Sequence, residues 1–165
     1  MKKVLIAIIA LSTTLSVSAQ QKFGHIDSAA LLELMPEKAA AEKDLQAFAK
    51  EFETALQEMA KEYEGKIQSF QANEKSMVET VRNTKMREIA DLERRIQEFQ
   101  QQAQEEVGKK EQEVLTPIID KARKAIDEVA ADKGYTYVFD SSLGVLLYAD
   151  DSEDILADVK AKLGL

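Results

Sequence analysis

A run of about one hundred residues with a helical composition and an eleven-residue apolar period constrains this chain more than any other feature. Residues 36–133 are rich in Ala, Glu, Lys and Gln, and proline occurs there only at positions 36 and 117. Eleven residues fill three helical turns at about 3.67 residues per turn, so an apolar row at this spacing stays nearly straight along a helix. Each stripe is narrow and can bury one seam against one partner. The rows are Leu45, Leu56, Ile67, Val78 and Phe48, Met59, Phe70, Val81 in the first half, and Ile96, Val107, Ile118, Val129 and Leu92, Ala103, Val114, Ala125 in the second.

A single helix over residues 36–133 would leave its apolar stripe in water, whereas a reversal near the middle would let the two halves bury each other. We therefore expect an antiparallel helical hairpin, with arms of about 45 residues that reach about 65 Å at 1.5 Å per residue. No Gly or Pro marks the reversal, so we place it within residues 73–85. Asn73 and the pair Asn83–Thr84 weaken a helix there, and we favour Asn83–Thr84. Pro117 should kink the return arm, because it removes one backbone hydrogen bond.

The segments that flank this hairpin change period. Residues 20–35 predict a strand at 22–26 and a short helix that Asp27 or Ser28 caps. Together with the C-terminal residues they would form a small β body, so the fold class is mainly α with a small β body.

Residues 134–165 would complete this body. They predict two strands, 135–140 and 145–150, joined as a β-hairpin, and a final helix over 153–163. Both strands are apolar at nearly every position, which suggests that both of their faces are buried. One subunit with so small a sheet could hardly bury both faces, so oligomerisation is predicted.

Residues 1–19 have the pattern of a cleaved export signal. A short basic start is followed by the apolar run Val4–Leu11, and small residues precede Gln20, which predicts cleavage after Ala19. The apolar run is well short of the roughly 20 residues that a membrane-spanning helix needs. The chain has no cysteine, so a lipid anchor at the cleavage site is excluded. The pattern is bacterial and predicts a periplasmic protein.

Charge and composition also exclude several functions. A formal net charge of −8 argues against nucleic-acid binding, which requires basic residues to neutralise phosphates. One histidine, His25, and no cysteine leave little from which to build a metal site or a nucleophilic site. No phosphate-binding loop or serine motif occurs. We therefore expect no enzymatic activity, no cofactor and no metal, and a protein that acts by binding.

One segment departs from the acidic average. Residues 74–87 carry four cations against two acidic residues, near the expected end of the hairpin. Off-stripe apolar side chains lie in and beside it. A solvated helix surface and loose packing at the end of the hairpin would account equally well for these side chains. The cations are Lys75, Arg82, Lys85 and Arg87, and the apolar residues are Met77, Met86 and Ile89.

The terminal segments carry a family resemblance. Residues 23–27 (FGHID), the pair Pro36–Glu37, residues 134–140 (GYTYVFD) and residues 147–152 (LYADDS) resemble the Skp (OmpH-like) family of periplasmic chaperones. The resemblance covers the whole chain after the signal, although the helical middle is less specific than the ends. It implies a homotrimer, in which a β body holds three helical hairpins around a cavity. It also implies ATP-independent holding of unfolded outer-membrane proteins.

This resemblance suggests roles for the residues at the tip of the hairpin and for those of the β body. The tip residues Met77, Met86, Ile89, Lys75, Arg82, Lys85 and Arg87 would contact unfolded clients, and the cations could also meet an anionic membrane surface. The core of the trimer body would include Phe23, Ile26, Tyr137, Phe139, Leu146 and Tyr148. The best-known family members are strongly basic and this chain is acidic, so a lipopolysaccharide site is not carried over.

Two other interpretations fit the composition and the period. One is an exported coiled-coil scaffold or spacer that binds a single folded partner, and the resemblance alone separates it from a chaperone. The other is a prefoldin-like chaperone of the cytosol, which conflicts with the export signal.

Overall fold

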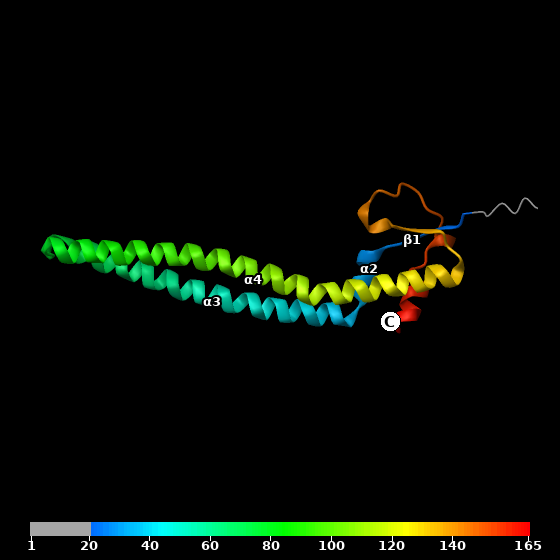
Figure 1. Ribbon diagram of the computed structural model, residues 1–165, viewed down its shortest axis with the longest axis horizontal. Helices are drawn as coiled ribbons and strands as arrows, with labels where there is room; N and C mark the ends of the chain where they lie inside the picture. Colours follow the sequence, from blue (N-terminus) through cyan, green and yellow to red (C-terminus); the bar gives the residue numbers. More distant parts are fainter. Residues whose placement is uncertain (1–20) are drawn as a thin grey trace, which may run out of the picture. The chain divides into compact units, whose positions relative to one another are not determined.

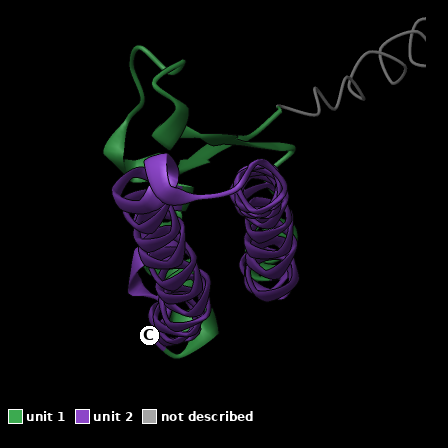
Figure 2. Ribbon diagram, turned by 90° about the vertical axis from the view of Figure 1, so that its left-hand side faces the viewer, with its two compact units in different colours: residues 1–28, 125–164 green, residues 29–124, 165 purple. Residues whose placement is uncertain are grey.

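The computed structural model describes residues 21–165, so the predicted export signal lies outside the described residues. The described residues divide into two compact units (Figure 2). The hairpin unit consists of residues 29–124, with Leu165, and the β unit consists of the described residues up to Ser28 and of Ala125–Gly164. Each unit is described separately below.

Two long helices form the hairpin unit. Helix α3 spans Pro36–Asn73 and helix α4 spans Glu79–Lys133, whose last residues belong to the β unit. Within the hairpin unit the two helices run side by side in opposite directions (Figure 1). Pro36 occupies the first turn of α3, where its missing N–H leaves no partner unsatisfied. The predicted helical hairpin is confirmed.

The eleven-residue stripe is the seam of this hairpin. On α4, Leu92 is 0% exposed and Ala103 6%, and both belong to one predicted row. On α3, the row members Leu45, Leu56 and Ile67 are half-buried. Phe52 reaches across the seam to Phe99, with 5.8 Å between the ring centroids.

The reversal lies between Asn73 and Glu79, inside the predicted window. A single 3-10 turn, Glu74–Ser76, links the helices, so the preferred position at Asn83–Thr84 was wrong. The Thr84 hydroxyl donates to the Thr80 carbonyl at 2.9 Å, which satisfies that hydroxyl inside the helix. Asn83 and Thr84, although weak helix formers, therefore lie inside α4. The helix also continues through Pro117.

The β unit contains a parallel strand pair. Strand β1 (Phe23–Ile26) lies beside β2 (Tyr137–Asp140), with Phe23 opposite Tyr137 and Ile26 opposite Asp140. The predicted β-hairpin was wrong, because residues 145–150 form no strand in the single chain. After β2 the Asp140 side chain accepts a hydrogen bond from the Ser142 amide and turns the chain into a 3-10 helix, Ser141–Leu143.

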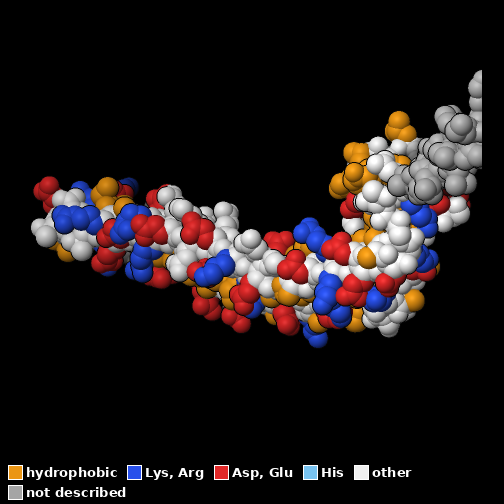
Figure 3. Space-filling model, turned by 45° about the vertical axis from the view of Figure 1, so that its right-hand side comes forward, with side chains coloured by type: hydrophobic (Ala, Val, Ile, Leu, Met, Phe, Trp, Pro, Cys, Tyr) orange, Lys and Arg blue, Asp and Glu red, His pale blue; other side chains and the backbone are white. Residues whose placement is uncertain are grey.

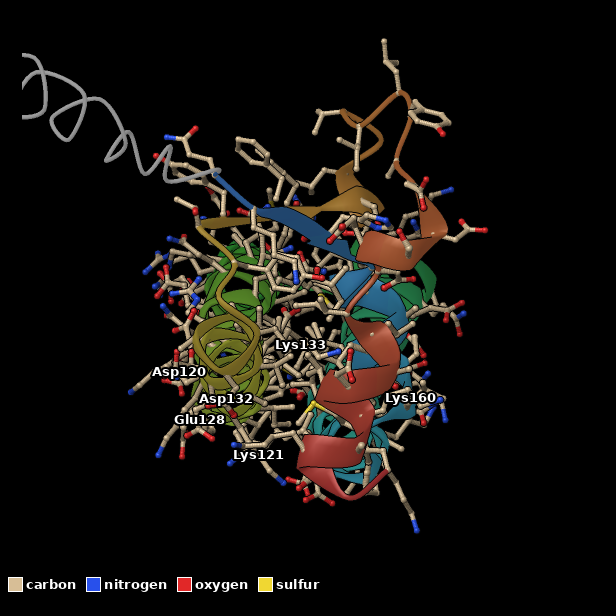
Figure 4. The ribbon with its side chains drawn as sticks, turned by 90° about the vertical axis from the view of Figure 1, so that its right-hand side faces the viewer. Asp120, Lys121, Glu128, Asp132, Lys133 and Lys160 are labelled. Carbon is tan, nitrogen blue, oxygen red and sulfur yellow. The ribbon has the colours of Figure 1, made fainter. Side chains whose placement is uncertain are left out.

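Short helices and the end of α4 complete both units. Helix α2 spans Ser28–Leu34, and helix α5 spans Leu156–Leu163, three residues later than predicted, after a 3-10 turn at Asp151–Glu153. In the β unit, Val129, Ile155 and Val159 are buried. Ion pairs join α4 to α5, with Lys162 to Glu128 at 3.0 Å and a second pair between Lys133 and Asp158. Figure 4 labels the α4 members of these pairs, Glu128 and Lys133.

In the part of the chain that the structure describes, no helix has both the length and the apolar composition needed to cross a membrane.

Asp140 ties the start of α2 to the end of β2. Its carboxylate accepts from the Ser28 amide at 3.3 Å and from the Ser28 hydroxyl. It also accepts from the Ser142 amide at 3.0 Å and from the Ser142 hydroxyl at 2.7 Å. Burial acts to raise the pKa of Asp140, but these hydrogen bonds outweigh burial and hold the pKa below its usual value.

Replacing Asp140 with Asn should lower the free energy of unfolding by about 1–3 kcal/mol at pH 7, because hydrogen bonds to a charged acceptor are lost. A carboxylate with a lowered pKa stabilises the fold above its unfolded pKa of about 3.9. That contribution disappears as the pH falls through the lower folded pKa. Urea unfolding at pH 7 and at about pH 3 would measure the difference between wild type and Asp140→Asn. An equal difference at both pH values would contradict this account.

Candidate functional site

The described residues offer no metal-binding group. No three His, Asp or Glu side chains within residues 21–165 lie close enough together to hold an ion. The single histidine, His25, lies on β1 with its Nε2 3.2 Å from the Asp150 carbonyl oxygen. The candidate sites are therefore surfaces. One lies at the reversal of the hairpin unit, and the other lies on the sheet of the β unit.

The four predicted tip cations do not share one role. The Arg82 guanidinium is half-buried and donates to two carbonyl oxygens of the turn, those of Glu74 at 3.5 Å and Met77 at 3.4 Å. Arg82 therefore holds the reversal together. The side chains of Lys75, Lys85 and Arg87 are exposed.

A groove of about 360 Å³ lies near the reversal, between α3 and α4; we call it the tip groove. Its apolar lining brings together Met77 and Ile89, two of the predicted contact residues, with Phe70 of α3. Met86 is 53% exposed and does not line the groove. The groove itself could not be predicted from the sequence, because a hollow depends on how two helices pack.

Charged side chains border the tip groove. Lys66 lies 3.6 Å from Glu62 on its own helix and 3.9 Å from Glu88 on α4, and Lys85 lies 2.8 Å from Glu88. The hydrogen bond from Lys85 lowers the pKa of Glu88 below its usual value. All four side chains are at least one-third exposed, so each ion pair contributes little stability and the side chains can move aside.

The second surface is one face of the sheet in the β unit, which we call the aromatic face. The Phe23 ring stacks between Tyr137 and Phe139, with centroid distances of 5.8 and 6.1 Å. All three rings are about half exposed, at 46–54%. The alternate residues Gly24 and Ile26 are buried, as the two-residue period of a strand requires. One face of the sheet is therefore covered and the other is open.

The loop that follows β2 continues this exposed apolar surface. Leu147 is 98% exposed and Tyr148 83%, and Val145 is 74% exposed. A cavity of about 260 Å³ lies between this loop and the aromatic face, lined by Phe23, Phe139, Leu146 and Tyr148 among others. Figure 3 shows hydrophobic side chains gathered on this part of the β unit. Five of the six predicted body-core residues therefore lie on the aromatic face or in the loop beside it: Phe23, Tyr137, Phe139, Leu146 and Tyr148. Ile26 lies on the covered face instead and is buried within the single chain.

Comparisons with known proteins agree with this architecture. The model of the family described as "Outer membrane protein (OmpH-like)" matches residues 22–163. A comparison with curated proteins gave no match. Among solved structures, the chain is similar to a protein of Caulobacter crescentus CB15 that is provisionally described as an outer membrane chaperone (OmpH-like). That match has 16% sequence identity and a TM-score of 0.73, and it covers 88% of this chain and 85% of the other.

Because Arg82 holds the turn and Arg87 is only exposed, replacing each by Gln should have different effects. Arg82→Gln should destabilise the turn by about 1 kcal/mol, the contribution of a modest hydrogen bond. Hydrogen exchange of residues 74–78, which include the Met77 amide bonded to the Glu74 carbonyl, would then be several-fold faster. Arg87→Gln is the matched control and should leave this exchange unchanged. Equal exchange in both variants would show that Arg82 does not hold the turn.

Proposed function

We propose that this chain, which belongs to the OmpH-like family, is a chaperone that holds unfolded outer-membrane proteins in the periplasm. It does so without ATP and prevents their aggregation. The observation that carries this proposal is the end of the hairpin, where a groove lined by Met77 and Ile89 opens among partly exposed charged side chains. Methionine adapts to many partners, which suits clients of differing sequence.

The charges of the tip support capture of clients rather than tight binding. Lys75, Lys85 and Arg87 are exposed, and exposed charges mainly accelerate encounter and are screened by salt. They would meet acidic clients, and transiently an anionic membrane surface, before the acidic remainder of the chain does. Arg82 belongs to the turn and would support the site indirectly.

The β unit supports assembly into a homotrimer. The aromatic face and the loop after β2 expose several large apolar side chains beside one another, and such patches mark interaction surfaces. In the described residues β2 pairs only with β1, so its other edge is open to a strand from another copy. Residues 145–150, which have a strand pattern but form no strand in the described part of the chain, would supply that strand. Phe23, Ile26, Tyr137, Phe139, Leu146 and Tyr148 would then form the shared core.

Periplasmic location follows from the export signal at residues 1–19, with cleavage after Ala19. The absence of cysteine from the sequence suits that oxidising compartment.

The direct test of the chaperone role is aggregation of an unfolded outer-membrane barrel protein diluted from urea. The chain without residues 1–19 should suppress light scattering at a stoichiometric ratio of trimer to barrel, with no nucleotide present. Undiminished aggregation would refute the proposal. Capture from periplasmic extract separates the scaffold alternative, since a scaffold should retain one folded protein and a chaperone many unfolded ones.

Replacing Phe139 with Asp should break the trimer and leave the long helices intact. The variant places a charge in the proposed shared core, where an unpaired charge costs several kcal/mol, and threefold symmetry repeats that cost three times. Light scattering should report a single-chain mass, while circular dichroism retains most of the helical signal. Val78→Asp, at a 68% exposed position in the turn, is the control and should remain trimeric. A trimeric Phe139→Asp variant would show that the aromatic face is not the interface.

A further inference from the structure

The two long helices each contain one interior glycine, Gly65 in α3 and Gly108 in α4. Glycine is a poor helix former, second only to proline. Neither residue has a positive φ angle, and a Cβ atom added at either position would meet no heavy atom within 4 Å. Neither backbone conformation nor close packing therefore explains why glycine occupies these two positions.

Both glycines line a groove between the helices. Gly65 lines the tip groove, and Gly108 lines a second groove of about 690 Å³ farther from the turn, which we call the mid-arm groove. Its volume is typical of ligand-binding pockets. Three of its lining residues are small, Ala49 on α3 and Ala103 and Gly108 on α4, which leaves a hollow between the helices. The apolar lining consists of Ala49, Phe52, Leu56, Ala103, Val107 and Gly108.

One wall of the mid-arm groove is aromatic and held in place. Phe52 packs edge-on against Phe48, with ring centroids 5.2 Å apart, and against Phe99 across the seam at 5.8 Å. A ring fixed by two neighbours can receive an aromatic or aliphatic side chain with little loss of its own freedom.

The polar rim suits an extended peptide. Gln100 and Gln104 line the groove, and each carboxamide both donates and accepts hydrogen bonds, as a peptide backbone does. Glu53 and Glu111 also line it, and no lysine or arginine does. Glu53 already pairs with Lys50 at 2.9 Å, which leaves Glu111 to favour a cationic or neutral neighbour over an anionic one.

We propose that the mid-arm groove binds one apolar side chain, preferably aromatic, of an extended unfolded polypeptide. The inference rests on the proposed chaperone function and deepens it by giving clients a defined contact on the arm. Gly108 keeps the groove open at the expense of helix stability, and the glutamines contact the backbone beside the inserted side chain without reading its sequence.

Filling the groove tests this proposal. The probe is a fluorescein-labelled peptide of alternating Phe and Ser, and its affinity is measured by fluorescence anisotropy. Gly108→Leu should weaken binding about tenfold, because the inserted side chain takes the place of the peptide's side chain. Gln112→Leu, at an exposed position on α4 outside the groove, adds the same side chain and should bind as wild type. Equal affinities of the two variants would overturn the proposal.

A second variant separates a structural role from a binding role. Gly108→Ala adds only a methyl group and improves helix propensity, so it should raise the melting temperature and still weaken peptide binding about twofold. A raised melting temperature with unchanged affinity for both Gly108 variants would show that the groove is not a binding site. A lower oligomer mass of Gly108→Leu by light scattering would assign the groove to a second copy of the chain and would also overturn the proposal.

The barrel-aggregation assay separates a failure of the proposed chaperone function from a failure of the groove proposal. If wild type fails to suppress aggregation, the proposed function fails. If wild type suppresses it and Gly108→Leu binds the peptide as Gln112→Leu does, only the groove is refuted.

Discussion

Burial of one apolar stripe along each long helix is the interaction on which the hairpin unit depends. The stripe is narrow, so it supplies just enough apolar surface to join α3 to α4 and leaves most of each helix polar. Residues of the seam such as Leu92 and Ala103 are nearly inaccessible, whereas Val78 is 68% exposed at the reversal. An arm joined in this way can be long without a broad core. It also leaves hollows along the seam, and a glycine lines each of them, Gly65 in the tip groove and Gly108 in the mid-arm groove.

The β unit, in contrast, leaves a large part of its apolar surface unburied within the single chain. Its sheet has two strands, its covered face is completed by Ile26 and the residues packed below it, and its aromatic face stays open. A two-stranded sheet is marginal by itself in water. The apolar loop after β2 adds to the exposed surface instead of covering it. These features are accounted for together if the surface is shared between copies of the chain, which would also bring several arms into one assembly.

The helices could be predicted from local sequence patterns. Features that depend on contacts between residues distant in the sequence could not. The eleven-residue period gave the two arms, because helix formation depends on neighbours within a few turns. The reversal was misplaced because the Arg82 side chain bonds to carbonyls up to eight residues away and stabilises a turn without Gly or Pro. The β-hairpin was wrong because the chain turns into a 3-10 helix after β2, where the Asp140 side chain accepts from the Ser142 amide, and residues 145–150 form no strand. The strand that does pair with β2 lies more than 100 residues earlier in the chain. Met77 and Ile89 were singled out as off-stripe residues near the reversal, but the tip groove that they line was not foreseen. The mid-arm groove was missed, although Gly108 inside a long helix was a signal that could have pointed to it.

The central claim is that several arms from one assembly enclose an unfolded client. Native mass spectrometry of the chain without residues 1–19, mixed with an unfolded outer-membrane barrel protein, measures this directly. The account predicts a species of three chains without client and a species of three chains with one barrel protein. A single chain, alone or with one barrel protein bound, would contradict it.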